Sequence, residues 1–198
     1  MGLGILILLF AFPVVAKKVD SRIGVQTLGA PEVFEAEALL SRLGYWAGPI
    51  DGAFDSRSRH ALIAFQKVEG RKRTGRLTSK ELAALRKASK PLPTQSGYPH
   101  IEIDLKRQVL FVVDSSGVIS HILPVCSGNE QTYIDHGQVH RAHTPRGRFK
   151  ITRKTSGFHL SSLGLLYYPN YIYEGIAIHG SWAMAVYPDS HGCIRIPM

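Results

Sequence analysis

Two hydrophobic patterns divide this chain. In residues 32–86 apolar positions recur every three or four residues, as on one face of an α-helix. From residue 98 onward, short apolar runs and alternating apolar and polar positions predict β-strands. Residues 87–97 (KASKPLPTQSG) lie between them, lack periodicity and have the composition of a linker. The pattern predicts a small helical module followed by a β domain.

The first part predicts three helices. The first covers residues 32–43, and Gly44 suits the C′ position that follows it. The second covers residues 56–68, with Asp55 or Ser56 as the N-cap. Residues 78–81 (TSKE) form a capping-box sequence at the start of the third.

The second part predicts a mainly antiparallel β domain, because strands do not alternate with helices as they would in a parallel sheet. The polar segment 129–143 is expected to be a loop over or beside a cleft. The expected fold class is α+β, with a small three-helix domain followed by a β-sandwich-like domain. Its strands are expected at 101–105, 109–113, 118–125, 149–151 and 175–178, with a hairpin turn at 115–117.

The N-terminus carries an uncharged apolar run, residues 2–16, followed at once by two lysines. This run is short for a membrane span but suits the core of a signal peptide, and Val14 and Ala16 are small residues at the positions before a cleavage site. We therefore expect a signal peptide at 1–16, a spacer at 17–31 and export to the periplasm or cell wall, with no stable membrane span after cleavage. An uncleaved anchor and a buried helix are the alternatives.

The formal net charge of +9 favours an anionic partner: a wall polymer, a membrane surface or nucleic acid. The chain has neither zinc-finger spacing nor an RNA-binding aromatic signature, so we expect no nucleic-acid binding. We also expect a monomer. One basic cluster could contact an anionic polymer or could be an ordinary solvated face; it comprises Lys67, Arg71, Lys72, Arg73 and Arg76.

The strongest chemical signal is Cys193, in the sequence SHGCIR, with a second His-Gly pair at His179 and Gly180. A thiol that histidines can approach is the minimum set for nucleophilic cysteine catalysis. Cys126 lies in an apolar stretch and is expected to be a buried strand residue. A disulfide between the two cysteines is the alternative, but it would consume the candidate nucleophile.

Two stretches resemble known families. Residues 32–86 resemble the small three-helix peptidoglycan-binding domain found beside many wall enzymes, through the motifs GY, DGAF, AFQ and LT. Residues 98–198 resemble the catalytic domain of L,D-transpeptidases. The motifs that carry this resemblance occur in the family's order; they are IDL at 103–105 with Gln108, Val125 with Gly128, TPRGRF at 144–149, IHG at 178–180 and SHGCIR at 190–195.

The resemblance implies catalytic roles. Cys193 would be the nucleophile, and His179 the proton donor and acceptor, oriented by the backbone carbonyl of Gly180. Sequence proximity to Cys193 alone favours His191 as the base, but the family assignment makes it an accessory group. We expect the neighbouring imidazole to stabilise a thiolate–imidazolium pair.

Four further residues are candidates for substrate binding. Arg195 could bind a substrate carboxylate or form a structural ion pair. Ser190 could be a hydrogen-bond partner or a turn residue, and backbone N–H groups around Gly192 and Cys193 could bind the oxyanion. Trp182 could line the cleft or serve only in packing.

By the resemblance, the partner is peptidoglycan, both stem peptides and glycan. The cysteine would attack the carbonyl of the third stem residue, release D-alanine and pass the acyl group to a neighbouring stem, which makes a 3→3 cross-link. Water as acceptor would give an L,D-carboxypeptidase or endopeptidase. Because the chain ends shortly after Cys193, where family members continue, we expect an apparently truncated domain and keep an inactive wall-binding protein as a further alternative.

No metal or organic cofactor is implied. Three histidines, His136, His140 and His143, could suggest zinc, but their spacing is not that of known sites, and we expect no cysteine or acidic ligand near them.

Overall fold

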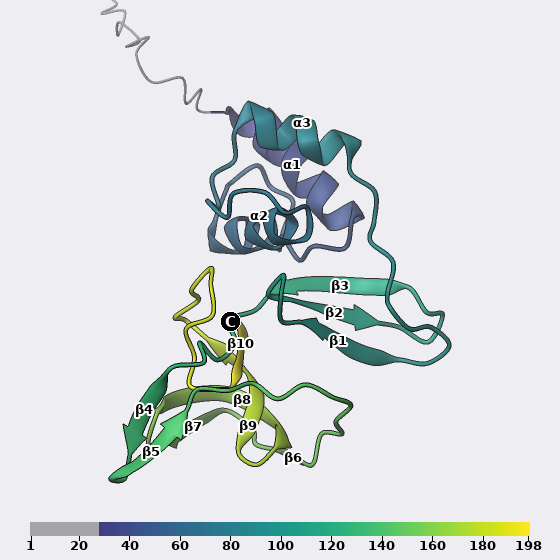
Figure 1. Ribbon diagram of the computed structural model, residues 1–198. Coiled ribbons are helices and arrows are strands. Elements are labelled where there is room, and N and C mark those ends of the chain that lie inside the picture. Colours follow the sequence, from purple (N-terminus) through teal and green to yellow (C-terminus); the bar gives the residue numbers. More distant parts are fainter. Residues whose placement is uncertain (1–27) are drawn as a thin grey trace, which may run out of the picture.

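The computed structural model describes residues 28–198 (Figure 1). The expected signal peptide and most of the expected spacer lie outside these residues. None of the described helices is long and apolar enough to cross a membrane. The elements are α1 (Ala30–Arg42), α2 (Ser56–Val68), α3 (Ser79–Lys87), β1 (His100–Asp104), β2 (Val109–Val113), β3 (Ile119–Pro124), β4 (Thr132–Asp135), β5 (Gln138–Arg141), β6 (Arg153–Lys154), β7 (Phe158–Ser161), β8 (Gly164–Tyr173), β9 (Ile176–Ser181) and β10 (Ile194–Pro197).

The three predicted helices are confirmed, and their ends follow from local chemistry. Gly44 adopts φ 95° just after α1, a conformation that glycine reaches without a Cβ clash. The Asp55 carboxylate accepts the N–H groups of Arg57 and Ser58 and caps α2. The Thr78 hydroxyl accepts the Glu81 N–H at 3.2 Å. Only this half of the capping box is seen, because the Glu81 carboxylate pairs with Arg71.

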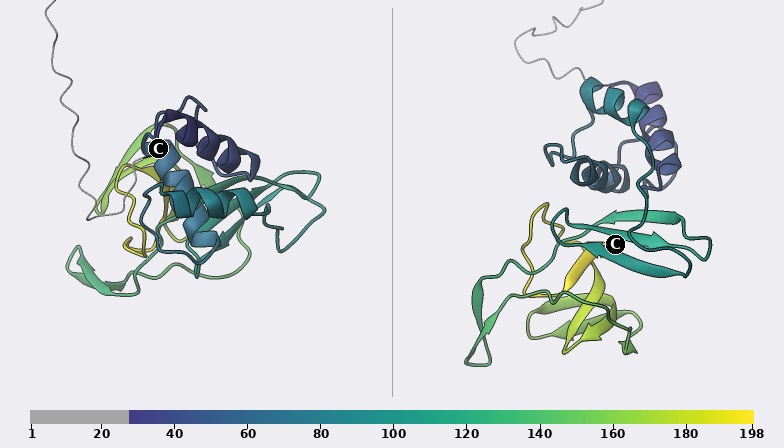
Figure 2. Two further views of the ribbon diagram at one scale, coloured as in Figure 1. Left: turned by 90° about the horizontal axis from the view of Figure 1, so that it is seen from above. Right: turned by 45° about the vertical axis from the view of Figure 1, so that its right-hand side comes forward.

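The molecule has three layers: the helices, the sheet β1-β2-β3, and a second sheet of order β10-β9-β8-β6 in which β7 also pairs with β8 (Figures 1 and 2). Strand β2 is buried on both faces. Val109, Phe111 and Val113 belong to the cluster shared with the helices, whereas Leu110 and Val112 pack toward the second sheet. This two-sided burial explains why β2 reads as a continuous apolar run.

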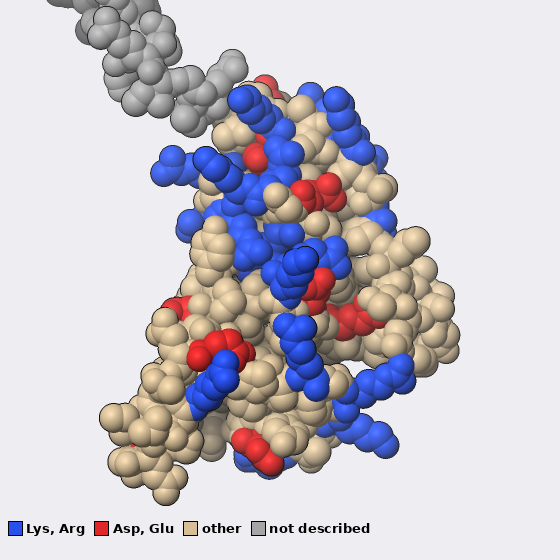
Figure 3. All heavy atoms as spheres, in the orientation of Figure 1, with Lys and Arg blue, Asp and Glu red and all other residues tan. Residues whose placement is uncertain are grey.

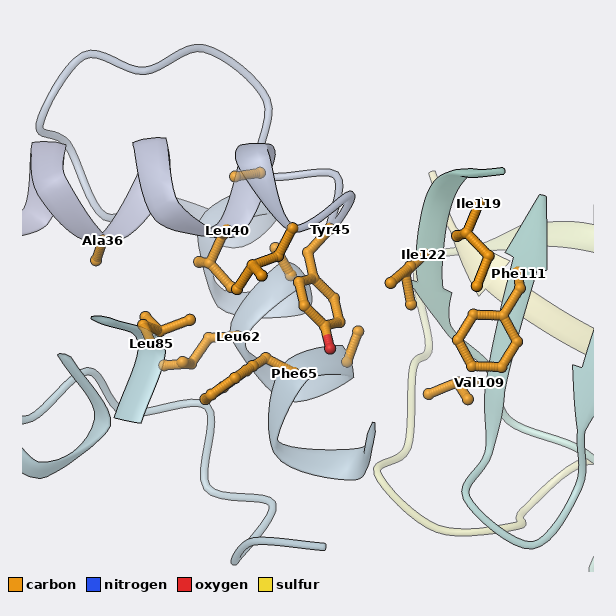
Figure 4. Close-up of a cluster of buried hydrophobic side chains, with 14 of the residues drawn as sticks. Ala36, Leu40, Tyr45, Leu62, Phe65, Leu85, Val109, Phe111, Ile119 and Ile122 are labelled. Atoms are coloured by element: carbon orange, nitrogen blue, oxygen red, sulfur yellow. The ribbon is translucent and has the colours of Figure 1, made fainter. Parts of the chain in front are cut away.

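The helical module and the first sheet share one hydrophobic core. Figure 4 shows Tyr45 and Phe65 on the helical side, facing Ile122 and Phe111 of the sheet. The backbone joins the two parts as well, because the Ile122 N–H donates to the Gly44 carbonyl at 2.7 Å. Residues 88–99 connect the parts without helix or strand. The two modules are therefore packed directly on each other.

The β domain is mainly antiparallel, as expected, with one parallel pair between β9 and β10. Strands β7, β8 and β10 were not predicted. Strand β8 loses its alternation where its pairing with β9 shifts register between Tyr167 and Asn170, and Pro169 lies at this irregularity.

Two local expectations are wrong. Segment 129–143 contains the hairpin β4–β5, and both of its strands are largely exposed, so no buried face marks them in the sequence. Residues 149–151 are not a strand, and pairing with β8 begins only at Arg153. Phe149 and Ile151 are instead exposed apolar side chains.

Candidate active site

His179 lies on β9, and the chain enters the neighbouring parallel strand β10 directly after Cys193. Figure 1 shows the two strands side by side. The register pairs Arg195 with His179. Cys193 immediately precedes β10, and its Sγ lies 3.4 Å from the N–H of Ala177. Ala177 and His179 are two residues apart on β9, so they share a face and are about 7 Å apart along the strand. Cys193 packs against the cluster that contains Ala177, so its thiol lies on the face of the sheet that carries Ala177 and His179. Among residues 28–198 no hydrogen bond joins Sγ to the imidazole, and the Sγ–H points instead to the Gly175 carbonyl at 3.9 Å.

His179 is held in one orientation. Its side chain is buried, and Nδ1 lies 2.9 Å from the carbonyl oxygen of Gly180. A carbonyl can only accept, so Nδ1 carries the proton and Nε2 keeps its lone pair. A Cβ at Gly180 would come within 2.9 Å of the Tyr167 ring, so glycine is required for this close packing.

The electrostatics of the pair differ from the expected ion pair. Burial raises the pKa of the Cys193 thiol above its usual value, although the Ala177 N–H and the Arg195 charge oppose this. Burial also lowers the pKa of His179, against the effect of the Gly180 hydrogen bond. Both directions favour a neutral thiol beside a neutral imidazole in the resting protein.

The backbone around Cys193 is fixed by Ser190. The Ser190 hydroxyl donates to the Cys193 carbonyl at 2.6 Å and accepts the Gly192 N–H at 3.1 Å. The Gly192 N–H is therefore occupied. Within residues 28–198 the Cys193 N–H has no hydrogen-bond acceptor, so it is the available oxyanion donor of this pair. Gly192 has φ 132° and approaches the His143 carbonyl, where a Cβ would be 2.9 Å away.

The positive charge of Arg195 lowers the pKa of His179 and the pKa of Cys193. Across the described ranges no carboxylate lies within 4.0 Å of its guanidinium. The structural ion pair considered above is thus not seen there. The guanidinium remains a candidate for binding a carboxylate from outside the chain.

Tyr133 is a site residue that the sequence reasoning missed. It comes from β4 and packs edge-on against the exposed ring of His191, with ring centroids 4.5 Å apart. Burial raises the pKa of Tyr133, and the nearby Asp135 and Cys193 charges raise it further. Tyr133 is the single aromatic residue in a polar segment, and this was the available signal.

Trp182 is not brought next to the thiol by any contact in residues 28–198. It is 69% exposed and stacks on Phe158, with centroids 5.3 Å apart. The three histidines considered for zinc also have separate neighbours: His136 pairs with Asp135, His140 stacks on Tyr133, and His143 pairs with Glu130. Among residues 28–198 no group of three potential metal ligands occurs.

Both cysteines are free, and Cys126 is fully buried, as expected. It is not a strand residue, because β3 ends at Pro124 and Cys126 forms only an isolated bridge to Arg195. The interpretation of the basic cluster is wrong for Lys67, which is only 2% exposed and donates to the Val125 carbonyl of the β domain. Figure 3 shows Lys and Arg side chains gathered over the helical module on the face in view.

Comparison with known proteins agrees with this architecture. Residues 29–85 match a family described as a putative peptidoglycan binding domain, and residues 98–198 match the L,D-transpeptidase catalytic domain. No curated protein matches the chain significantly.

Two solved structures resemble the chain. One is an L,D-transpeptidase (residues 123–326) from Xylanimonas cellulosilytica, with 37% identity, a TM-score of 0.81, and coverage of 85% of this chain and 83% of that one. The other is an L,D-transpeptidase (Yku) from Stackebrandtia nassauensis, with 22% identity, a TM-score of 0.44, and coverage of 83% and 80%. The site geometry, the family match over the β domain and the first of these structures together show that the chain belongs to the L,D-transpeptidase family.

Proposed function

We propose that this protein is an exported peptidoglycan L,D-transpeptidase that forms 3→3 cross-links through a thioester on Cys193. The observation that carries the proposal is the His179 arrangement. Its Nδ1–H is bound to the Gly180 carbonyl, so Nε2 is free to act as a base on the face of the sheet that also carries Cys193.

Because burial favours the neutral thiol, the proton leaves Cys193 as attack begins. The thiol would first turn from the Gly175 carbonyl toward His179. Its proton then passes to Nε2 while Sγ bonds to the carbonyl carbon of the third stem residue. The resulting oxyanion accepts the Cys193 N–H. Its collapse breaks the C–N bond, the imidazolium gives its proton to the departing D-alanine amine, and a thioester remains.

The second half of the reaction is the reverse with a new amine. The side-chain amine of a neighbouring stem loses a proton to His179 and attacks the thioester. The C–S bond breaks, the new amide forms, and the proton returns to sulfur. Arg195 would bind a stem carboxylate near the thiol, and the packed rings of His191 and Tyr133 would lie beside the bound stem.

The helical module would bind peptidoglycan and keep the catalytic domain at its polymer. Its match to a putative peptidoglycan binding domain and the chain's charge of +9 support this role. Export by the N-terminal apolar segment follows from the same substrate, because peptidoglycan lies outside the cytoplasm.

Replacing Cys193 with alanine tests the proposal. Cys126→Ala is the matched control, because it removes the other free cysteine. We expect C193A to form no thioester by intact mass and no muropeptide dimers, while it still binds isolated peptidoglycan. C126A should form both products. Dimer formation by C193A would contradict the proposal, and trimmed stems without dimers from the wild type would assign hydrolysis in place of transfer.

A further inference from the structure

Residues 182–189 form a loop between β9, which carries His179, and the SHGCIR motif, which carries Cys193. We call this segment the catalytic loop. In Figure 1 this loop rises from β9 toward α2 of the helical module. Arg73, which follows α2, contacts it twice. Its Nη1 donates to the Val186 carbonyl at 3.1 Å, and its guanidinium carbon lies 4.9 Å from the centroid of the Tyr187 ring.

The helical module also binds the segment that starts at Val125 and contacts the catalytic loop. The buried Nζ of Lys67 donates to the Val125 carbonyl at 2.8 Å. From Val125 the chain continues into Cys126, whose Sγ–H donates to the Tyr187 carbonyl at 3.4 Å. Arg73 and Lys67 of the helical module therefore bind the catalytic loop and the neighbouring segment at Val125, to which the loop is hydrogen-bonded through Cys126.

Hydrogen bonds connect the end of the catalytic loop to the backbone around Cys193. The Ser127 carbonyl accepts the N–H groups of both Asp189 and Ser190, at 3.0 and 2.9 Å. Ser190 in turn binds the Cys193 carbonyl and the Gly192 N–H. A displacement of the catalytic loop would thus change the position of Ser190 and the backbone that presents the sulfur.

We infer that Arg73 is a positioning residue for the catalytic loop, so that the helical module is part of the catalytic unit as well as a substrate anchor. The inference rests on the proposed role of Cys193. Arg73 is suited to this task because a planar guanidinium can donate to a carbonyl and stack on an aromatic face together. Alanine removes both contacts and leaves the Val186 carbonyl without its partner.

The test compares Arg73→Ala with Lys72→Ala in the full chain. Lys72 is exposed, is adjacent in sequence and carries the same charge, so it controls for the loss of one cation near an anionic substrate. We expect R73A to lower kcat for stem-peptide transfer about tenfold, the effect of losing one charge-assisted hydrogen bond, with KM changed less than about twofold. K72A should keep the wild-type kcat.

A second readout does not depend on catalysis. Hydrogen exchange at the Asp189 and Ser190 amides should be faster in R73A than in the wild type and unchanged in K72A. If C193A proves active, the proposed function fails, but faster exchange in R73A would still support the positioning role. Equal kcat and equal exchange in R73A and K72A would overturn it.

Arg73→Lys covers the case in which R73A does not fold. Lysine keeps a charge near the Tyr187 ring and one donor, but it lacks the planar fork. We expect kcat and exchange between those of the wild type and R73A. Wild-type kcat together with wild-type exchange at Asp189 and Ser190 in R73K would then overturn the inference.

Discussion

Thr144 fixes the position of Gly192, the residue before the candidate nucleophile. Its buried hydroxyl donates to the Gly192 carbonyl at 2.7 Å and accepts the Gly128 N–H at 2.9 Å. One side chain thus ties together three segments that are distant in the sequence. The TPRGRF motif begins with this residue, so the motif supports the site through contacts of the Thr144 hydroxyl with the backbone.

Thr144→Val should test this support. Valine has nearly the same shape but no hydroxyl, so the Gly192 carbonyl and the Gly128 N–H would be buried without partners. We expect the free energy of unfolding to fall by about 2 kcal/mol, measured by urea denaturation, and thioester formation on Cys193 to slow. Thr132→Val on exposed β4 is the control and should change stability by less than about 0.5 kcal/mol. Equal stability of the two variants would contradict this role.

Much of the helical module could be predicted because its signals are local. The Asp55 cap, the glycine after α1 and the apolar stripe each act within a few residues. The DGAF motif also proves to be structural: the buried Glu37 carboxylate accepts the N–H groups of Asp51 and Gly52, at 3.1 and 2.9 Å, and the Ser58 hydroxyl. A folded loop around a buried carboxylate thus accounts for these residues without a ligand.

Cys193 and His179 could be predicted from the sequence for another reason. Cys193 and His179 stand in short motifs whose residue types carry their own chemistry. The sequence could not show their protonation, because burial depends on the packing of β8, β9 and β10. Nor could it show that the Gly192 N–H is already bound by Ser190.

Contacts between distant segments were beyond the sequence. Lys67 looked like one cation of an exposed cluster, but it lies 58 residues from its acceptor, Val125. Strand β8 was not predicted because its register shift removes the period-two pattern. The hairpin β4–β5 was not predicted because neither of its faces is buried. In each case the deciding partner comes from another part of the chain.

The protonation of the site gives a second prediction, for a chain carrying Cys126→Ala. Because burial raises the pKa of Cys193, alkylation of its thiol by iodoacetamide should increase steadily with pH up to and beyond 9. Because burial lowers the pKa of His179, the acidic limb of thioester formation should lie below pH 6.5.

A resting thiolate–imidazolium pair would behave differently. Alkylation would then be fast and constant between about pH 6 and 8, since the thiolate would already be formed. His179→Gln serves as the control, because it keeps a polar side chain without a titrating ring. It should slow thioester formation strongly and leave no acidic limb in the residual rate, while the rise of alkylation with pH stays in place.

Lys67 gives the third prediction, through the dependence of stability on pH. Burial, helped by the Arg73 charge and opposed by Cys126, lowers the pKa of Lys67 from 10.5 to about 7. Between these values the unfolded chain binds the proton and the folded chain does not, so this group's contribution to stability rises with pH from about 7 to 10.5 and is lost as pH falls through 7.

Lys67→Met removes that dependence while it keeps a flexible apolar stem in the core. We expect the difference in unfolding free energy between the wild type and K67M to move in favour of the wild type as pH rises from 6 to 9, in urea titrations at each pH. Between pH 7 and 9 this difference should change by about 1.4 kcal/mol for each pH unit, because the unfolded chain holds one more proton than the folded chain over that range. Lys72→Met, at an exposed position, should show no such trend. A difference between wild type and K67M that stays constant over this range would mean that Lys67 remains charged where it is buried between the two modules.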